Sequence, residues 1–379
     1  MKIIHVADTH LGYSAYRKVT QDGINQREYD NYQTFKQFID YTIQTKPDLI
    51  LHSGDLYDSV RPTNRAITYS IDQIMRLSKN KIPIIIIAGN HEQPKLKETG
   101  HIFSIFDHIE YVHPIYKTEY ETHSFTIKKE KITIHAIPQT NTKKDFENNL
   151  KKLKKDKTAK YNILVAHGAV TGIKEFKMNE FNELIIPTKT LSKDFDYIAL
   201  GHYHKYTQLQ KNAFYAGSTE RYTFTDAKDK KGFIELELNK TNLKTKFIEL
   251  KTRPMIDTKP IDCTNLPLEK VMTKIKTTIQ TIQPKEKTFR IKLKNIPSHT
   301  YRGLDFTTIR KLGGEATHYE LKADIIKEGE TKTKQTSTID PLENEFQTYI
   351  KKQEIKEKTT MLELGLNYIK KIQTRDEGK

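Results

Sequence analysis

Short runs of β-branched and other apolar residues recur through the first part of the chain, and each stops at Gly, Pro, Asn or Asp. This pattern is typical of short buried strands that end in turns. The runs are KIIHVAD, DLILHSGD, IPIIIIAGN, ITIHAIP, YNILVAHG, YIALGHYH and FYAGST. Helical patterns separate several of them, as in residues 27–46, so the sequence predicts an α/β layered domain over residues 1–252. Continuous apolar runs such as 84–88 predict a sheet that is covered on both faces.

The character of the chain changes after this domain. Residues 255–328 combine one amphipathic helix, an alternating strand at 289–294, a helix ended by glycine and a second strand, which predicts a small α+β unit. Residues 329–339 are polar without an apolar face, so we expect a linker. Residues 340–372 then show two short amphipathic helical patterns.

The two C-terminal patterns have two interpretations. The helices either pack back onto the small α+β unit or dock onto the coiled coil of a partner protein. We favour the second, because the polar linker separates them from the rest of the chain. The predicted partner-binding residues are Leu342, Phe346, Tyr349, Ile350, Leu362, Leu366 and Ile369.

Charge and composition narrow the class of function. The formal net charge of +16 comes mostly from Lys and favours a polyanionic partner such as nucleic acid, bound largely without sequence specificity. Lysine used as a general solubiliser is the alternative. No apolar run approaches the roughly 20 residues of a membrane helix. Cys263 is the only cysteine, which excludes an internal disulfide and suggests a reducing cytosol.

Metal-binding residue types follow the ends of the predicted strands. The carboxyl ends of strands in an α/β sheet form the usual ligand site, so residues far apart in the sequence can converge there. Carboxylate, imidazole and amide donors suit two divalent ions, which together can activate water and clamp a phosphoryl oxygen. Each motif taken singly has a structural explanation as a turn, but the ordered set favours a metal site. The candidate ligands are Asp8, His10, Asp55, Asn90, His167, His202 and His204.

The motifs D-x-H, G-D, G-N-H-E, H and G-H-x-H occur in this order within residues 1–250. In this respect the chain resembles the calcineurin-like metallophosphoesterase superfamily, whose fold is a two-sheet α/β layered domain. The stretches HVADTHLGY, NQREYDNYQTF, LILHSGDLYDSVRPT and YAGSTER are similar to the nuclease subunits of double-strand-break repair complexes, the counterparts of the nuclease in bacterial SbcCD.

This resemblance implies a ligand set for two Mn²⁺ ions per chain. Asp8, His10, Asp55 and His204 would hold the first ion, and Asp55, Asn90, His167 and His202 the second. It also implies that His91 stabilises the transition state or protonates the leaving oxygen. Some relatives carry a second histidine three residues after the bridging aspartate, where this chain has Asp58. That departure leaves the balance between exonuclease and endonuclease activity open.

The resemblance implies partners as well. Residues 255–328 would form a DNA-capping domain, and 340–372 would bind a coiled-coil, SMC-like ATPase. The expected activity is endonuclease and 3'–5' exonuclease cleavage of DNA by a cytoplasmic, nucleoid-associated homodimer in a prokaryote. Because they lie beside motif residues, Tyr16, Arg17 and Arg61 are the predicted contacts to the DNA backbone. The Lys-rich segment 143–160 is either a solvated helix face or a second phosphate contact.

Other interpretations stay open at this point. His5 and His52 lie inside strand patterns, which favours core or supporting roles. The same superfamily contains phosphatases and phosphodiesterases of small substrates, although the basic charge and the additional domains count against that function. A scaffold that tethers DNA ends with little catalysis is a third hypothesis, and the complete ligand set counts against it.

Overall fold

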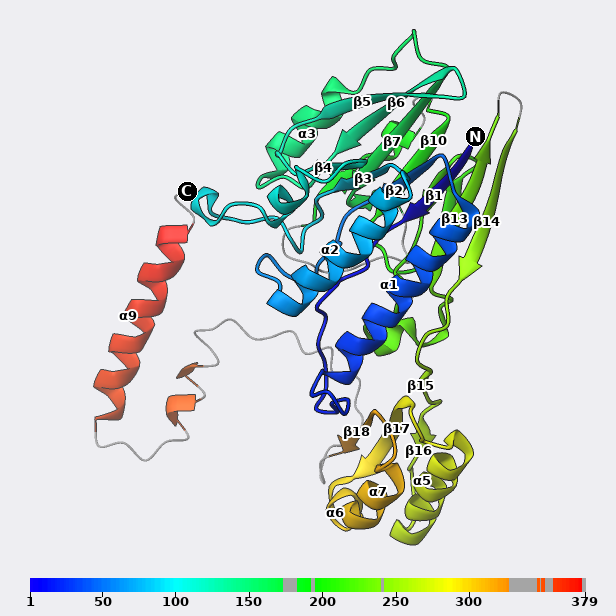
Figure 1. Cartoon of the computed structure of the whole chain (residues 1–379). Helices are drawn as coiled ribbons and strands as arrows, with labels where there is room; N and C mark the ends of the chain where they lie inside the picture. Colours follow the sequence, from blue (N-terminus) through cyan, green and yellow to red (C-terminus); the bar gives the residue numbers. More distant parts are fainter. Residues whose placement is uncertain are drawn as a thin grey trace. The chain divides into compact units, whose positions relative to one another are not determined.

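The computed structural model describes residues 1–172, 183–191, 195–239, 242–326, 346–347, 349–351 and 357–376. Two compact units divide the chain, one of residues 1–325 and one of residues 326–379. The larger unit contains two six-stranded sheets and a smaller four-stranded sheet (Figure 1).

The first large sheet has the order β14-β13-β1-β2-β3-β4. Its parallel part consists of β1 (Lys2–Val6), β2 (Leu49–His52), β3 (Ile84–Ile87) and β4 (Val112–Ile115). The neighbours β13 (Gly232–Leu238) and β14 (Leu243–Glu249) join antiparallel. Helices α1 (Gln26–Thr45) and α2 (Asn64–Lys79) pack on one face of this sheet, where Ile4, Val6 and Ile50 share a core with the apolar side of α1.

The second large sheet has the order β11-β12-β10-β7-β6-β5. Its strands are β5 (Glu121–Ile127), β6 (Glu130–Ile137), β7 (Tyr161–His167), β10 (Tyr197–Gly201), β11 (Thr207–Gln210) and β12 (Ala213–Tyr215). Strands β6, β7, β10 and β12 run parallel, with antiparallel neighbours at both edges. Helix α3 (Lys143–Lys152) packs on its outer face through Phe146 and Leu150.

Strand alternation explains why the two sheets stack. Ile3 and Leu51 of the first sheet share a core with Ile163 and Val165 of the second, whereas Ile4 points the opposite way toward α1. Each central strand is therefore buried on both faces, as its continuous apolar sequence predicts. The α/β fold with two layered sheets is confirmed.

The small α+β region follows at residues 255–326. Its sheet joins β15 (Met255–Asp257), β16 (Ile261–Asp262), β17 (Thr288–Pro297) and β18 (His318–Ile326). Helix α5 (Leu268–Ile282) covers it with Val271, Ile275 and Ile279, together with α6 (Ser298–Arg302) and α7 (Phe306–Gly313). Arg253, just before this region, links it to the layered domain, with two hydrogen bonds to Asp30 and one to the carbonyl oxygen of Glu286.

The remaining elements are short. They are η1 (Lys97–Thr99), η2 (Ile102–Phe106), β8 (Ala169–Val170), β9 (Ile185–Ile186), α4 (Thr188–Leu191) and η3 (Phe224–Lys228). In the part of the chain that the structure describes, no helix combines the length and the apolarity needed to cross a membrane.

The second unit contains α9 (Lys358–Asp376). The Phe346 ring packs so closely on Gly365 of α9 that a side chain there would collide with it. Tyr349 is 61% exposed and Ile350 only 4%, while the predicted residues Leu362, Leu366 and Ile369 are partly buried. The predicted linker 329–339 and Leu342 lie outside the described residues.

Candidate metal centre

The candidate ligands gather where strands of both large sheets end. Asp8 follows β1, Asp55 follows β2 and Asn90 follows β3, all from the first sheet. His167 ends β7 and His202 follows β10, both from the second sheet. Parallel strands place these loops at one edge, and the stacking of the two sheets brings the two sets of loops together.

Asp55 lies at the centre of this cluster. Its Oδ2 atom is 3.4 Å from His167 Nε2 and 3.8 Å from His10 Nε2, so it faces both groups of candidate ligands. On one side, His10 Nε2 is 3.2 Å from His204 Nε2. The ligand atoms of Asp8, Asp55 and His167 all lie within 4.8 Å of one another. Asp55 is therefore placed to contribute a carboxylate ligand to a bound cation.

Asn90 joins the histidines of the other side. Its Oδ1 atom is 2.8 Å from His167 Nε2 and 3.1 Å from His202 Nδ1. The backbone N–H of His202 donates to Asp8 Oδ1 at 2.9 Å, which ties the β10 loop to the β1 loop. Every candidate ligand predicted from the sequence therefore lies in one connected cluster.

Backbone strain accompanies this convergence. Asp8, His10, Asp55 and His202 have φ angles of 51°, 42°, 56° and 108°, in the left-handed region that L-residues rarely adopt. Strained residues of this kind gather at functional sites, where the surrounding structure holds them. Close packing adds a further constraint, because a Cβ atom on Gly89 would lie 2.1 Å from Asp55 Oδ1.

The electrostatics of the cluster favour a cation. Burial alone would lower the pKa of His167, but the charge of Asp55 outweighs it and raises the pKa to about 10. Burial also opposes ionisation of Asp55, yet His167 holds the pKa of Asp55 well below its usual range. Positive charge is thus favoured between buried carboxylates, and the nitrogen and oxygen donors suit borderline divalent ions. These residues fit a divalent metal site.

His91 lies beside the cluster and does not belong to the candidate ligand set. Its backbone N–H donates to Asp55 Oδ1 at 3.0 Å, and its Nδ1 is 2.9 Å from the carbonyl oxygen of Asp58. These two contacts fix the ring, whose side chain is 34% exposed.

Asp58 occupies the position where some relatives carry a histidine. Its Oδ1 atom lies 3.3 Å from His10 Nδ1 and 3.8 Å from His91 Nδ1. The carboxylate is thus closer to the candidate ligand His10, while its own carbonyl oxygen contacts His91. A carboxylate on the second ring nitrogen of a metal-binding histidine fixes its tautomer and orientation.

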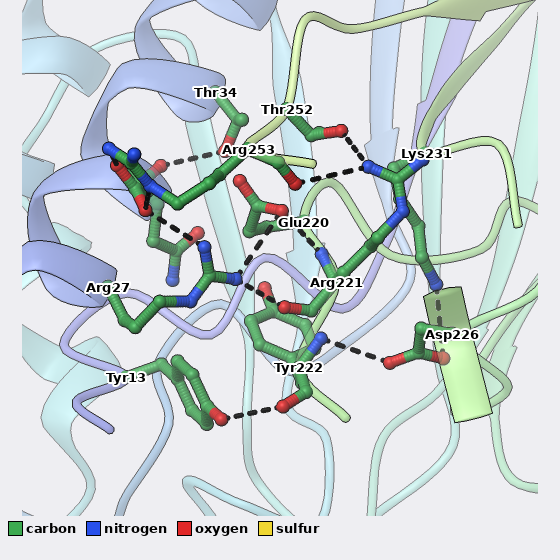
Figure 2. Close-up of polar contacts among 12 residues, drawn as sticks. Tyr13, Arg27, Thr34, Glu220, Arg221, Tyr222, Asp226, Lys231, Thr252 and Arg253 are labelled. Atoms are coloured by element: carbon green, nitrogen blue, oxygen red, sulfur yellow. Dashed lines mark hydrogen bonds and ion pairs between the residues drawn. The ribbon is translucent and has the colours of Figure 1, made fainter. Parts of the chain in front are cut away.

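Sequence reasoning missed the buried residues that hydrogen-bond to the backbone of the ligand loops, of which Figure 2 labels Tyr222 and Lys231. The Tyr222 hydroxyl donates to the carbonyl oxygens of Asp8 at 3.2 Å and of Thr9 at 3.0 Å. Buried Lys231 donates from Nζ to the carbonyl oxygen of His204 at 2.7 Å and pairs with Asp226 at 3.2 Å. Tyr222 directly follows the motif YAGSTER, so its position in the sequence could have marked it as a candidate. No sequence pattern distinguishes Lys231 from the many other lysines of the chain.

The same segment reaches the connection to the small region. Arg27 of α1 hydrogen-bonds to Asp30 at 2.8 Å and to the carbonyl oxygen of Arg221, and its guanidinium lies 3.5 Å from Glu220 (Figure 2). Arg221 in turn hydrogen-bonds to Thr252. Residues 220–222 therefore contact both the metal-site loops and the start of the connection to the small region.

The predicted DNA contacts are placed differently from one another. Tyr16 stacks on His318 of the small region, with ring centroids 3.7 Å apart, whereas Arg17 and Arg61 are exposed. The interior histidines His5 and His52 are fully buried, and burial lowers the pKa of each to about 3. His5 contacts Ser53 and Tyr197, and His52 contacts Thr9, so both have supporting roles.

The sequence profile of the calcineurin-like phosphoesterase family matches residues 1–206. The chain belongs to this family. Family membership implies divalent-metal binding, in agreement with the donor set described above. The resemblance predicted at the level of the superfamily is confirmed.

Three relatives named "DNA double-strand break repair protein Mre11" are similar to this chain. The protein of Methanococcus maripaludis is 31% identical over 239 residues, which cover 61% of this chain and 60% of the relative. That of Sulfolobus acidocaldarius is 27% identical over 367 residues, covering 93% and 90%. That of Methanocaldococcus jannaschii is 31% identical over 263 residues, covering 66% of each. The narrower predicted resemblance to repair nucleases therefore has support from named relatives.

Proposed function

We propose that this calcineurin-like phosphoesterase is a metal-dependent DNA nuclease that processes DNA ends in double-strand-break repair. The observation that carries the proposal is the convergence of carboxylate, imidazole and amide donors around Asp55. The names of the Mre11 relatives supply the substrate and the process. The net charge of +16 supports a polyanionic substrate.

The proposal assigns the ligands as the sequence motifs imply. Asp8, His10, Asp55 and His204 would hold one Mn²⁺, and a second would bind to the other residues that face Asp55. The residues of this second position are Asp55, Asn90, His167 and His202. Two such ions supply an activated water and a clamp on the phosphoryl oxygens.

His91 would act on the leaving oxygen. The carbonyl oxygen of Asp58 orients its Nδ1, and its backbone N–H donates to Asp55 Oδ1, so the ring is held beside the candidate metal centre. A proton donated from Nε2 would neutralise the charge that develops as the P–O bond breaks. Endonuclease and 3'–5' exonuclease action, which the family resemblance implies, are part of the proposal.

One assay tests the activity. The full chain is incubated with Mn²⁺ and single- or double-stranded DNA, beside His91→Ala and the matched surface variant His108→Ala. We expect His91→Ala to lower kcat by about 10²–10⁴-fold, the usual contribution of a positioned acid, and His108→Ala to match wild type. A wild-type chain that cleaves small phosphodiesters but leaves DNA intact would contradict the nuclease proposal.

Metal stoichiometry has its own measurement. Titration calorimetry with Mn²⁺ should reveal two sites per chain in the wild type. Asn90→Ala should retain one site, since the two histidines that Asn90 contacts, His167 and His202, are both assigned to the second position. A single site in the wild type would contradict the two-ion assignment.

The proposed protein partner is a coiled-coil, SMC-like ATPase that binds the C-terminal unit. Helix α9 carries exposed Met361, Leu364 and Tyr368, spaced i, i+3 and i+7 along one face. This row extends the predicted partner-binding set, in which Tyr349 is exposed and Ile350 is buried. Exposed apolar rows of this kind mark interaction sites.

Two variants test the partner proposal with the purified ATPase. Truncation after Lys334 and the double substitution Leu364→Glu/Tyr368→Glu should both abolish binding while Mn²⁺-dependent cleavage persists. Undiminished binding by the truncated chain would contradict the assignment. Homodimerisation and a nucleoid-associated, cytoplasmic location remain predictions, which sedimentation analysis and imaging of a tagged chain can test.

A further inference from the structure

Two polar side chains interrupt the apolar layer between the two large sheets. Ile3, Ala7 and Leu51 of the first sheet belong to the core that this layer forms with the second sheet. Strand alternation places His5 between Ile3 and Ala7 on the same face of β1. Ser53 lies two positions after Leu51, just beyond the end of β2. Both polar residues are fully buried, and burial of a polar group is costly unless it is hydrogen-bonded, so their contacts need an explanation.

His5 uses both of its ring nitrogens within this layer. Its Nδ1 is 3.0 Å from the hydroxyl of Tyr197, in β10 of the second sheet, and its Nε2 is 2.8 Å from Ser53 Oγ. Burial lowers the pKa of His5 to about 3, so the ring is neutral and offers one N–H donor and one acceptor nitrogen. Hydroxyl groups both donate and accept, so the two partners satisfy this ring in either tautomer. His5 therefore holds the Ser53 side chain at a fixed place relative to the second sheet.

The backbone of Ser53 contacts a proposed metal ligand. His167 Nδ1 is 2.9 Å from the carbonyl oxygen of Ser53, whereas Asp8 Oδ1 is 4.0 Å from the same nitrogen. The turn packs directly on the ring, because a Cβ atom on Gly54 would collide with His167 Nδ1. A hydrogen bond from Nδ1–H to the carbonyl oxygen leaves Nε2 facing Asn90 Oδ1 at 2.8 Å. The Ser53 carbonyl oxygen thus selects the ring nitrogen that His167 presents to a cation.

We propose that His5 and Ser53 are positioning residues for His167. They act through a hydrogen-bonded chain that begins at Tyr197 and ends at the second metal position. The Tyr197 hydroxyl holds the His5 ring, and the ring holds the Ser53 hydroxyl. The Ser53 carbonyl oxygen then orients His167. Contacts to the second ring nitrogen of a metal-binding histidine fix its tautomer and orientation and strengthen metal binding. This inference rests on the proposed assignment of His167 as a ligand.

Titration calorimetry of the full chain with Mn²⁺ tests the inference without cleavage. We expect His5→Phe and Ser53→Ala each to weaken binding at one of the two positions by about 10- to 100-fold, the usual effect of residues that orient metal ligands. Binding at the other position should keep the wild-type affinity. The matched control is His135→Phe, which removes another buried histidine, bonded to Asn162 and Tyr120 in the second sheet. This control should leave both Mn²⁺ affinities unchanged.

Two conservative variants separate orientation from packing. The amide of His5→Gln stands in for the imidazole Nε2, so it keeps a contact to Ser53 and should recover most of the Mn²⁺ affinity that His5→Phe loses. The shorter amide of His5→Asn stands in for Nδ1, which faces Tyr197, and should not recover it. Urea unfolding of the metal-free variants measures their stability in parallel. Losses of Mn²⁺ affinity that simply follow the losses of stability, with no recovery in His5→Gln, would overturn the positioning role.

His167→Ala separates this inference from the proposed function. We expect it to lose one Mn²⁺ position. Such a loss, combined with wild-type binding in both His5→Phe and Ser53→Ala, overturns the positioning role alone and leaves the ligand assignment standing. If His167→Ala binds two Mn²⁺ ions with wild-type affinity, the ligand assignment is wrong, and the positioning role falls with it.

Discussion

The metal centre and the small region at 255–326 bury very different side chains. At the metal centre Asp8, Asp55 and His167 are almost completely buried, on loops with left-handed backbone at the two aspartates. In the small region the core consists of apolar residues such as Val271 and Ile275, and Asp257 forms its ion pairs near the surface. The first arrangement costs stability and provides chemistry, whereas the second provides stability. The two regions therefore differ in the polarity of the side chains that they bury.

The largest effect should come from Asp55→Asn, which removes the charge between the two groups of candidate ligands. We expect kcat/KM for DNA cleavage to fall about a thousandfold or more, because several kcal/mol of charge stabilisation depend on the bound ions. Calorimetry should show loss of Mn²⁺ binding. If Asp55→Asn binds Mn²⁺ as tightly as wild type, Asp55 is not the shared ligand.

A core substitution in the small region should change stability alone. Ile275→Ala removes a fully buried side chain, so we expect the free energy of unfolding to fall by about 2–5 kcal/mol in urea titrations that follow this region. Mn²⁺ affinity at the metal centre should stay at the wild-type value. A loss of Mn²⁺ affinity in Ile275→Ala would show that the stability of the small region and metal binding are coupled.

Tyr222→Phe probes the support of the ligand loops. The carbonyl oxygens of Asp8 and Thr9 lose a buried donor, which should destabilise the protein by about 1–3 kcal/mol. Mn²⁺ affinity should fall about tenfold, since residues that orient metal ligands have effects of that size. Tyr319→Phe in the small region is the matched control. Equal Mn²⁺ affinities in the two variants would show that Tyr222 does not orient the ligand loops.

The smallest effect is expected for Asp257→Asn. Hydrogen bonds from Arg290 hold the pKa of Asp257 below its ordinary value, with a further contribution from Lys292. A lowered pKa in the folded state stabilises the protein above the unfolded-state pKa, and this contribution disappears as the pH falls through the folded value. The pair is near the surface, so the difference at pH 7 should be at most about 1 kcal/mol and should vanish in acid. A difference that persists at about pH 2 would contradict this origin.

The sequence was sufficient to predict the central strands that carry the candidate ligands and the residues that follow them. Runs such as Ile84–Ile87 are buried on both faces, and Asn90 follows directly, so local pattern alone placed the donor at the sheet edge. In the small region the predicted helix face through Val271 and Ile279 is the buried face of α5. These features depend on neighbours in sequence, which is why spacing reveals them.

Other features have no local signal. Lys231, the residue before β13 of the first sheet, donates to the carbonyl oxygen of His204, which follows β10 of the second sheet. The orientation of the Asp58 carboxylate toward His10 likewise depends on how two loops approach each other. On α9, the predicted residues are partly buried, and a different row is exposed, since Phe346 packs on Gly365.

The sequence by itself determined the type of chemistry, because carboxylates, imidazoles and an amide stand in order at strand ends. Tertiary structure decided which of these groups are in contact and which of their loops receive hydrogen bonds from buried side chains such as Tyr222 and Lys231. It also decided where a cavity opens beside them. The physical reason is that strand and helix periodicity is set by a few neighbouring residues. Contacts such as that between Tyr222 and Asp8 join positions more than 200 residues apart and arise only when the two sheets pack.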